Sequence, residues 1–259
     1  MSDALSPQSP LPAPSHRVVD VPVRMAHALL ATGFLGAWLT SGVRGLQPVH
    51  LAFGYTAAAA LVFRLLWALL NPRSASLSTW WRAAGGWPRW WRAARQGQVR
   101  FAALSTIALA STVIAMLLGV ALSTGSGALM HQLGEHHAWG EVLEELHEAL
   151  GNALLLAVLM HLALVGVLSV MRGRNMASTM LTGRAPGAGP DRIQRPHAIV
   201  GALLLMAVLA GWWWAAPFDS RGASVNRAGP GHGDHAAGGR EEGGVSDAAD
   251  EGDGGDDDD

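Results

Sequence analysis

Histidine inside apolar segments is the feature of this sequence most able to do chemistry. The chain contains eleven histidines, and four of them lie in or at the ends of long apolar segments: His27, His50, His147 and His161. A polar side chain surrounded by lipid is costly without a partner, so its presence there indicates a functional site. For any one of these histidines alone, an interhelical hydrogen bond or a position among the lipid headgroups is an equally good interpretation.

The spacing of the four histidines favours a shared role. His147 and His161 are fourteen residues apart in one apolar segment. On a helix this spacing gives a rise of about 21 Å and an angle about 40° short of four full turns. Both imidazoles therefore point towards one side of the helix at different depths. If successive helices alternate in direction, His50 lies level with His147. By the same reasoning, His27 lies nearer the level of His161.

Two facing imidazoles are the axial ligands that a six-coordinate haem b requires. The sequence therefore predicts two haem b groups, an outer one held by His50 and His147 and an inner one held by His27 and His161. Because both axial positions are filled, no site is left for dioxygen, which favours electron transfer over oxygenase or peroxidase chemistry. Zinc or copper is less well suited, since paired ligands at separate depths do not make a cage of three or four ligands.

Arg64 is a further candidate site residue. It follows His50 by fourteen residues, so it lies on nearly the same side of the second predicted helix, at the inner level. A charge at mid-bilayer costs about 2.5–3.5 kcal/mol on insertion scales, so the guanidinium needs a counter-ion or a route to water. A propionate of the inner haem would serve as counter-ion. Snorkelling to the cytoplasmic headgroups is an equally good interpretation.

The elements that must position these residues are transmembrane helices. About 20 apolar residues cross the hydrocarbon core, and five segments qualify: 23–41, 50–70, 101–123, 148–170 and 198–216. They must be helical, because lipid offers backbone groups no hydrogen-bond partners. We expect an all-α membrane protein, with a four-helix transmembrane haem-binding bundle and a fifth C-terminal transmembrane helix. The chain has no cysteine, which excludes covalently attached haem, thiolate iron–sulfur clusters and disulfides.

The arginines predict the orientation of the chain. They gather before the first span and in the second and fourth connections, and the positive-inside rule places these segments in the cytoplasm. Residues 1–20 lack the apolar core of a signal peptide and are expected to be a disordered cytoplasmic N-terminus. Residues 217–259, rich in Gly and Asp, are expected to be a disordered acidic periplasmic tail. The Trp- and Arg-rich stretch 74–100 indicates an amphipathic segment at the cytoplasmic interface.

Three segments resemble the prokaryotic cytochrome b561 family, which includes the b-type cytochrome subunits of nickel–iron hydrogenases. They are Asp20-Val-Pro-Val-Arg-Met-Ala-His27, His50-Leu-Ala-Phe-Gly-Tyr55 continuing to Arg64-Leu-Leu-Trp67, and Leu146-His147-Glu148 through His161 to Gly166-Val167. The resemblance covers about residues 17–184, within a predicted domain of residues 21–184, and it leaves residues 185–216 as a connection and fifth helix. It implies a four-helix cytochrome with two b haems, whose ligand positions fall on the same four histidines. Ala28 departs from the Trp that often follows the first ligand in the family.

The expected function is that of a di-haem b-type membrane cytochrome in a respiratory chain. It would carry electrons between the quinone pool and a periplasmic redox protein, either a hydrogenase-like subunit or a c-type cytochrome. It would act as an electron-transfer subunit in membrane lipid, and no nucleic-acid partner is expected. The sequence is compatible with direct reaction with a quinone and with a homodimer. Two alternatives remain: a His-dependent proton or metal-ion transporter, which the lack of carboxylates deep in the spans disfavours, and a haem-free membrane anchor of an extrinsic enzyme.

Overall fold

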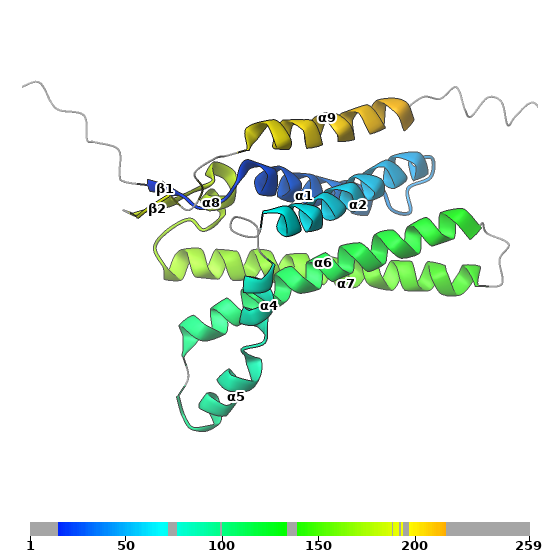
Figure 1. Ribbon diagram of the computed structural model, residues 1–259. Coiled ribbons are helices and arrows are strands. Elements are labelled where there is room, and N and C mark those ends of the chain that lie inside the picture. The colour runs from blue at the N-terminus through cyan, green and yellow to red at the C-terminus, as the bar shows by residue number, and fades with distance from the viewer. Residues whose placement is uncertain are drawn as a thin grey trace, which may run out of the picture. The chain divides into compact units, whose positions relative to one another are not determined.

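The structure is a computed structural model that describes residues 15–71, 77–98, 100–133, 139–187, 189–191, 193 and 197–215. Contacts divide the chain into two units, Met1–Phe218 and Asp219–Asp259. The second unit lies outside the described residues, as do residues 1–14, so the predictions of a disordered N-terminus and a disordered acidic tail fall there. The first unit is built mainly from long helices (Figure 1).

Two helical hairpins form the centre of the first unit. Helices α1 (Val21–Thr40) and α2 (Gln47–Leu70) pack along each other, as do α6 (Phe101–Leu133) and α7 (Gly140–Met171). The helices within each hairpin run antiparallel (Figure 1). The hairpins meet along α2 and α6, where the apolar side chains of Ala57, Leu61, Val120 and Leu154 form a buried cluster. Burying these side chains together stabilises the contact and holds four helices in one bundle.

Small residues allow α1 and α2 to approach closely. A Cβ added at Gly33 would lie 2.9 Å from the backbone nitrogen of Ala57, and one added at Gly36 would overlap the ring of Phe53. In membranes, helices associate by close packing of this kind, because apolar side chains gain nothing from leaving lipid for one another. The α1–α2 hairpin therefore depends on these two glycines.

Helices α6 and α7 are longer than the segments predicted for them. Their 33 and 32 residues correspond to about 50 Å each, against about 30 Å of hydrocarbon. The sequence predicted spans of 101–123 and 148–170 with a long connection between them. The predicted length of that connection is wrong, because α6 continues to Leu133 and α7 begins at Gly140. The hydropathy pattern identifies only the part of a helix that lies in lipid, whereas the intrahelical hydrogen bonds continue beyond it.

Helix α9 (Ala198–Ala215) packs on α1 and α2. Leu204 of α9 shares a buried cluster with Ala26 of α1 and Ala60 of α2. Near its end, the indole Nε1 of Trp212 donates a 2.8 Å hydrogen bond to the hydroxyl of Thr56. Trp212 therefore helps to hold the end of α9 against α2, while Trp213 and Trp214 are exposed.

Short elements join the entry of α1 to the exit of α7. Strand β1 (Ser15–Arg17) pairs antiparallel with β2 (Arg184–Pro186), which follows α8 (Ala177–Thr182). The Arg24 guanidinium donates to the carbonyl oxygens of Met180, at 3.0 Å, and Leu181. These bonds join the first turn of α1 to α8, which follows α7 in the chain.

The Trp- and Arg-rich stretch forms two short helices, α4 (Ser78–Ala84) and α5 (Trp87–Arg95), as an amphipathic segment should. Helix α4 packs against α6, and the indole of Trp87 on α5 donates a 3.0 Å hydrogen bond to the Ser111 hydroxyl of α6. The pair is therefore fixed to the bundle at the end where α6 begins (Figure 1).

The expectation of an all-α membrane protein is confirmed, since three of the described helices are long and apolar enough to cross a membrane: α2, α6 and α7. Helix α1 has Arg24 and His27 near its start, which lower its mean hydropathy. Helix α9 is apolar but shorter, at about 27 Å for 18 residues. Five crossings therefore stay a prediction.

Candidate functional site

The structure brings His50 and His147 together. His50 lies in the first turn of α2 and His147 in the second turn of α7, and their ring centroids are 6.2 Å apart at an interplanar angle of 79°. Two imidazoles bound to opposite sides of one metal ion, through bonds of about 2 Å, have centroids about 6 Å apart. The separation of this outer pair therefore fits ligation of a single iron from both sides.

Hydrogen bonds define which nitrogen each ring of the outer pair offers. The Nδ1 of His50 lies 2.8 Å from the carbonyl oxygen of Ala37, which can only accept, so Nδ1 carries the proton. The Ser126 hydroxyl donates to the carbonyl of Ser123 and therefore accepts from Nδ1 of His147, at 3.0 Å. Both rings are left with an unprotonated Nε2. An Nδ1 held by an acceptor, with Nε2 free, is the usual arrangement of a metal-ligating histidine.

The surroundings of the outer pair are tight beside His147 and open beside His50. A Cβ added at Gly127 of α6 would lie 2.9 Å from Cε1 of His147, so any larger residue would displace that ring. A pocket of about 310 Å³ opens beside His50 at the connection between α1 and α2, and Arg44 is the one cation among the residues that line it. This end of the bundle could therefore accept a carboxylate, such as a haem propionate.

The inner pair is less completely defined. His27 lies on α1 and His161 on α7, and their pairing stays a prediction. The Nδ1 of His161 is buried, and no group in the described part of the chain forms a hydrogen bond with it. An unpaired buried nitrogen costs about 1–3 kcal/mol; unlike in the outer pair, the described residues supply no acceptor that would orient the ring of His161. His27 itself is exposed.

Arg64 lies on α2 in the half of that helix nearer to its inner end, and its side chain is half-buried. The predicted role as partner of a haem propionate remains a prediction. Between the levels of the two histidine pairs lies the apolar cluster of Ala57, Leu61, Val120 and Leu154. This layer keeps water from the middle of the bundle, so it lowers the local dielectric between the two levels.

The donor set of this site is paired imidazole nitrogens. Within the described residues, no group of three or more His, Asp or Glu side chains could hold a metal ion. Pairs of histidines at two levels are suited to a macrocycle that already supplies four ligands to its iron. The residues present therefore fit haem.

Residues outside the predicted set support the bundle at its inner end. Asp20 is fully buried, and its two carboxylate oxygens accept from the backbone nitrogen of Val21 at 2.9 Å and from Nδ1 of His197 at 3.0 Å. His197, which precedes α9, thereby joins the start of α9 to the start of α1. Asp followed closely by Pro22 is a helix-start signal that could have identified Asp20 as a cap.

Replacement of Ser126 by Ala should weaken haem retention at the outer site by about 10-fold, because His147 loses the acceptor that orients its ring. The measurement is the rate of haem transfer from the purified protein to an excess of an apo-haem acceptor. Ser105→Ala is the matched control, since the Ser105 hydroxyl bonds only to the Ala102 carbonyl of its own helix. Equal haem loss in both variants would show that the Ser126 bond plays no part.

Comparison with known proteins identifies a family. The family model for prokaryotic cytochrome b561 matches residues 18–183, which is more than half of the chain. No curated protein and no solved structure matches the sequence. The match begins before α1 and ends at Gly183, so it includes all four histidines and excludes α9.

Proposed function

We propose that this chain, which belongs to the prokaryotic cytochrome b561 family and is therefore a b-type haem protein of membrane electron transfer, binds two haems and passes electrons between a quinone and a periplasmic redox protein. The observation that carries the proposal is the outer pair, in which His50 and His147 face each other with Nδ1 hydrogen-bonded and Nε2 free. His27 and His161 would hold the inner haem.

The residues of the chain act by holding and orienting the two haems. His50 and His147 would ligate the outer iron from α2 and α7, and the acceptors on Ala37 and Ser126 keep both rings turned towards it. When bound, haem supplies a one-electron couple at each level. Because two histidines would ligate each iron, haem held here would supply electron transfer without bond making at the metal.

Charged residues at each level would serve the propionates. Arg64 on α2 would pair with the inner haem, and Arg44 at the pocket beside His50 would pair with the outer one. The apolar cluster between the levels keeps the path dry, which reduces the reorganisation that accompanies each electron transfer.

The orientation follows from the arginines. We place the N-terminus in the cytoplasm and the outer pair towards the periplasm of a bacterial inner membrane, with five crossings that include α1 and α9. The periplasmic partner, a hydrogenase-like subunit or a c-type cytochrome, would then exchange electrons at the His50 level. Residues 217–259 would form a periplasmic tail, residues 21–184 the haem-binding domain and residues 185–216 the connection and fifth helix.

The experiment that tests this function is spectral. The full chain, purified in detergent, should show a low-spin haem b spectrum on reduction, and haem extraction should give about two haems per chain. Addition of a quinol should reduce the haem, and an oxidised c-type cytochrome should reoxidise it. A colourless protein from cells with ample haem would contradict haem binding, and one haem per chain would contradict the two-level arrangement.

A further inference from the structure

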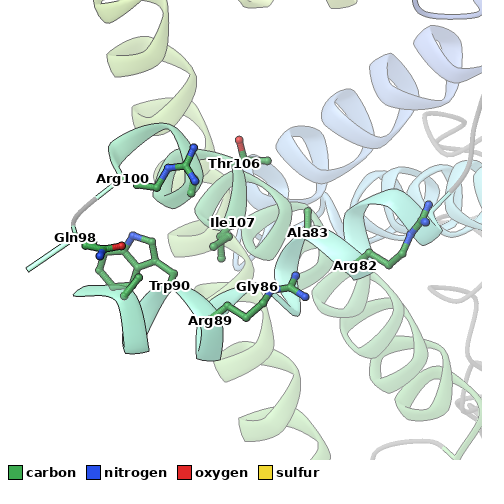
Figure 2. Close-up of a pocket in the computed structure, with 11 residues that line it drawn as sticks. Arg82, Ala83, Gly86, Arg89, Trp90, Gln98, Arg100, Thr106 and Ile107 are labelled. Carbon is green, nitrogen blue, oxygen red and sulfur yellow. The ribbon is translucent and has the colours of Figure 1, made fainter. Parts of the chain in front are cut away.

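A second pocket lies away from the histidines, at the end of the bundle where α6 begins. It has a volume of about 450 Å³ and is enclosed by α4, α5 and the first turns of α6 (Figure 2). Its floor is apolar and includes Gly86 and Ile107. These two residues approach closely because glycine has no side chain: a Cβ at Gly86 would lie 3.0 Å from Cδ1 of Ile107. Arg82, Arg89 and Arg100 lie around it (Figure 2).

The positive charge of this region has few internal partners. Six arginines occur between Arg73 and Arg100, whereas the sequence contains no Asp or Glu between Asp20 and Glu135. Among the described residues, the acids nearest this end of the bundle are Asp20, bound to His197, and Asp191, which accepts from the backbone nitrogen of Arg17 at 2.6 Å. The remaining described acids lie in the first turns of α7, at the opposite end. Since the described acids are bonded elsewhere or lie at the opposite end, the arrangement of these arginines favours an anion supplied by a ligand.

Trp90 adds a hydrogen-bond donor to the pocket. Its side chain lines the cavity, and its indole Nε1 is buried without a hydrogen-bond partner in the described part of the chain. A buried unpaired donor costs free energy unless an acceptor fills the site. An oxygen of a phosphate group would satisfy this donor and the neighbouring guanidinium groups together.

The geometry points to a site for the headgroup of an anionic phospholipid, with its phosphate among Arg89, Arg100 and Trp90 and its acyl chains in the surrounding lipid. A lipid is the occupant that fits, because the pocket has an apolar floor and a cationic rim, as a phospholipid requires. The pocket also lies on amphipathic helices beside α6, the helix that enters the membrane. Bound lipid would hold α4 and α5 against the bundle. The site is independent of the haem ligands and of the proposed electron transfer.

The test compares two lipids with the same acyl chains, phosphatidylglycerol and phosphatidylcholine, on the delipidated full-length holoprotein by native mass spectrometry. Each arginine near a surface contributes about 1 kcal/mol towards anionic lipid, which is about 5-fold in affinity, so Arg89 and Arg100 should together favour phosphatidylglycerol by about 25-fold. The double variant Arg89→Gln and Arg100→Gln should lose this preference. Trp90→Phe, which removes the indole N–H donor and keeps an aromatic ring, should weaken the binding of phosphatidylglycerol by about 5-fold.

The matched control is the double variant Arg92→Gln and Arg95→Gln. It removes the same number of positive charges, both from α5, and neither residue lines the pocket. The guanidinium of Arg95 lies over the ring of Trp91 instead, 5.4 Å from its centroid. The preference for phosphatidylglycerol should persist in this variant. Equal loss in both double variants would show general surface attraction and overturn the proposal. Displacement of the lipid by inorganic phosphate at low millimolar concentration would show a free-anion site and overturn it as well.

Discussion

Replacement of His50 by Ala should remove one of the two proposed haems and leave the other in place. The reason is that His50 and His147 face each other at 6.2 Å, whereas His27 and His161 are proposed to ligate a second haem at the other level. The measurement is haem per chain by extraction, which should fall from about two to about one, together with the loss of one component from a redox titration. His147→Ala should give the same result, because each iron needs both axial ligands.

The control for this prediction is His131→Ala. His131 is exposed in the last turn of α6, so its replacement should leave two haems. Unaltered haem content in His50→Ala and in His147→Ala would refute the outer site. Loss of both haems in either variant, with the protein still folded, would show that the two sites are not independent.

Replacement of Gly33 by Val should abolish assembly of both haem sites. The added Cβ would lie 2.9 Å from the backbone nitrogen of Ala57, and backbone cannot move aside as a flexible side chain can, so α1 and α2 must separate. Overpacking of this kind costs about 1–3 kcal/mol or more. Separation would also break the hydrogen bond from His50 to the Ala37 carbonyl and shift His27. We expect fewer than one haem per chain and a loss of monodisperse protein on gel filtration.

Gly54→Val is the matched control. Gly54 lies on α2 of the same hairpin, and a Cβ there would meet no described atom within 4 Å. This variant should retain about two haems and elute as the unaltered protein does. Equal behaviour of the two variants would show that helix propensity, rather than the close approach of α1 and α2, causes the defect.

The sequence was sufficient to predict the long apolar helices and the approach of His50 to His147. An apolar segment long enough to cross lipid must be helical, and the helical repeat then determines which residues share a side, as with His147 and His161. Alternation of direction follows from connectivity, and the structure brings His50 and His147 together at the end this reasoning predicts. These properties depend on residues that are close along the chain, so they can be predicted from the order of residues in the sequence.

The extent of α6 and α7 beyond the lipid was not predictable from hydropathy. The Trp- and Arg-rich stretch was recognisable as amphipathic, but its packing against α6, and with it the cationic pocket around Trp90, depends on the contact of Gly86 with Ile107. The position of α9 against α1 and α2 was also absent from the pattern, because an evenly apolar helix has no preferred side.

What the sequence by itself determined is therefore a set of membrane helices with imidazoles at two depths, since hydropathy and helical repeat are local properties. Only the tertiary structure decided which nitrogen each outer ring presents and how the bundle is held together. The Ala37 and Ser126 acceptors are 13 and 21 residues from the histidines they hold, and Asp20 is 177 residues from His197. Such pairs form only when packing brings distant segments within about 3 Å, and no local spacing rule specifies that approach.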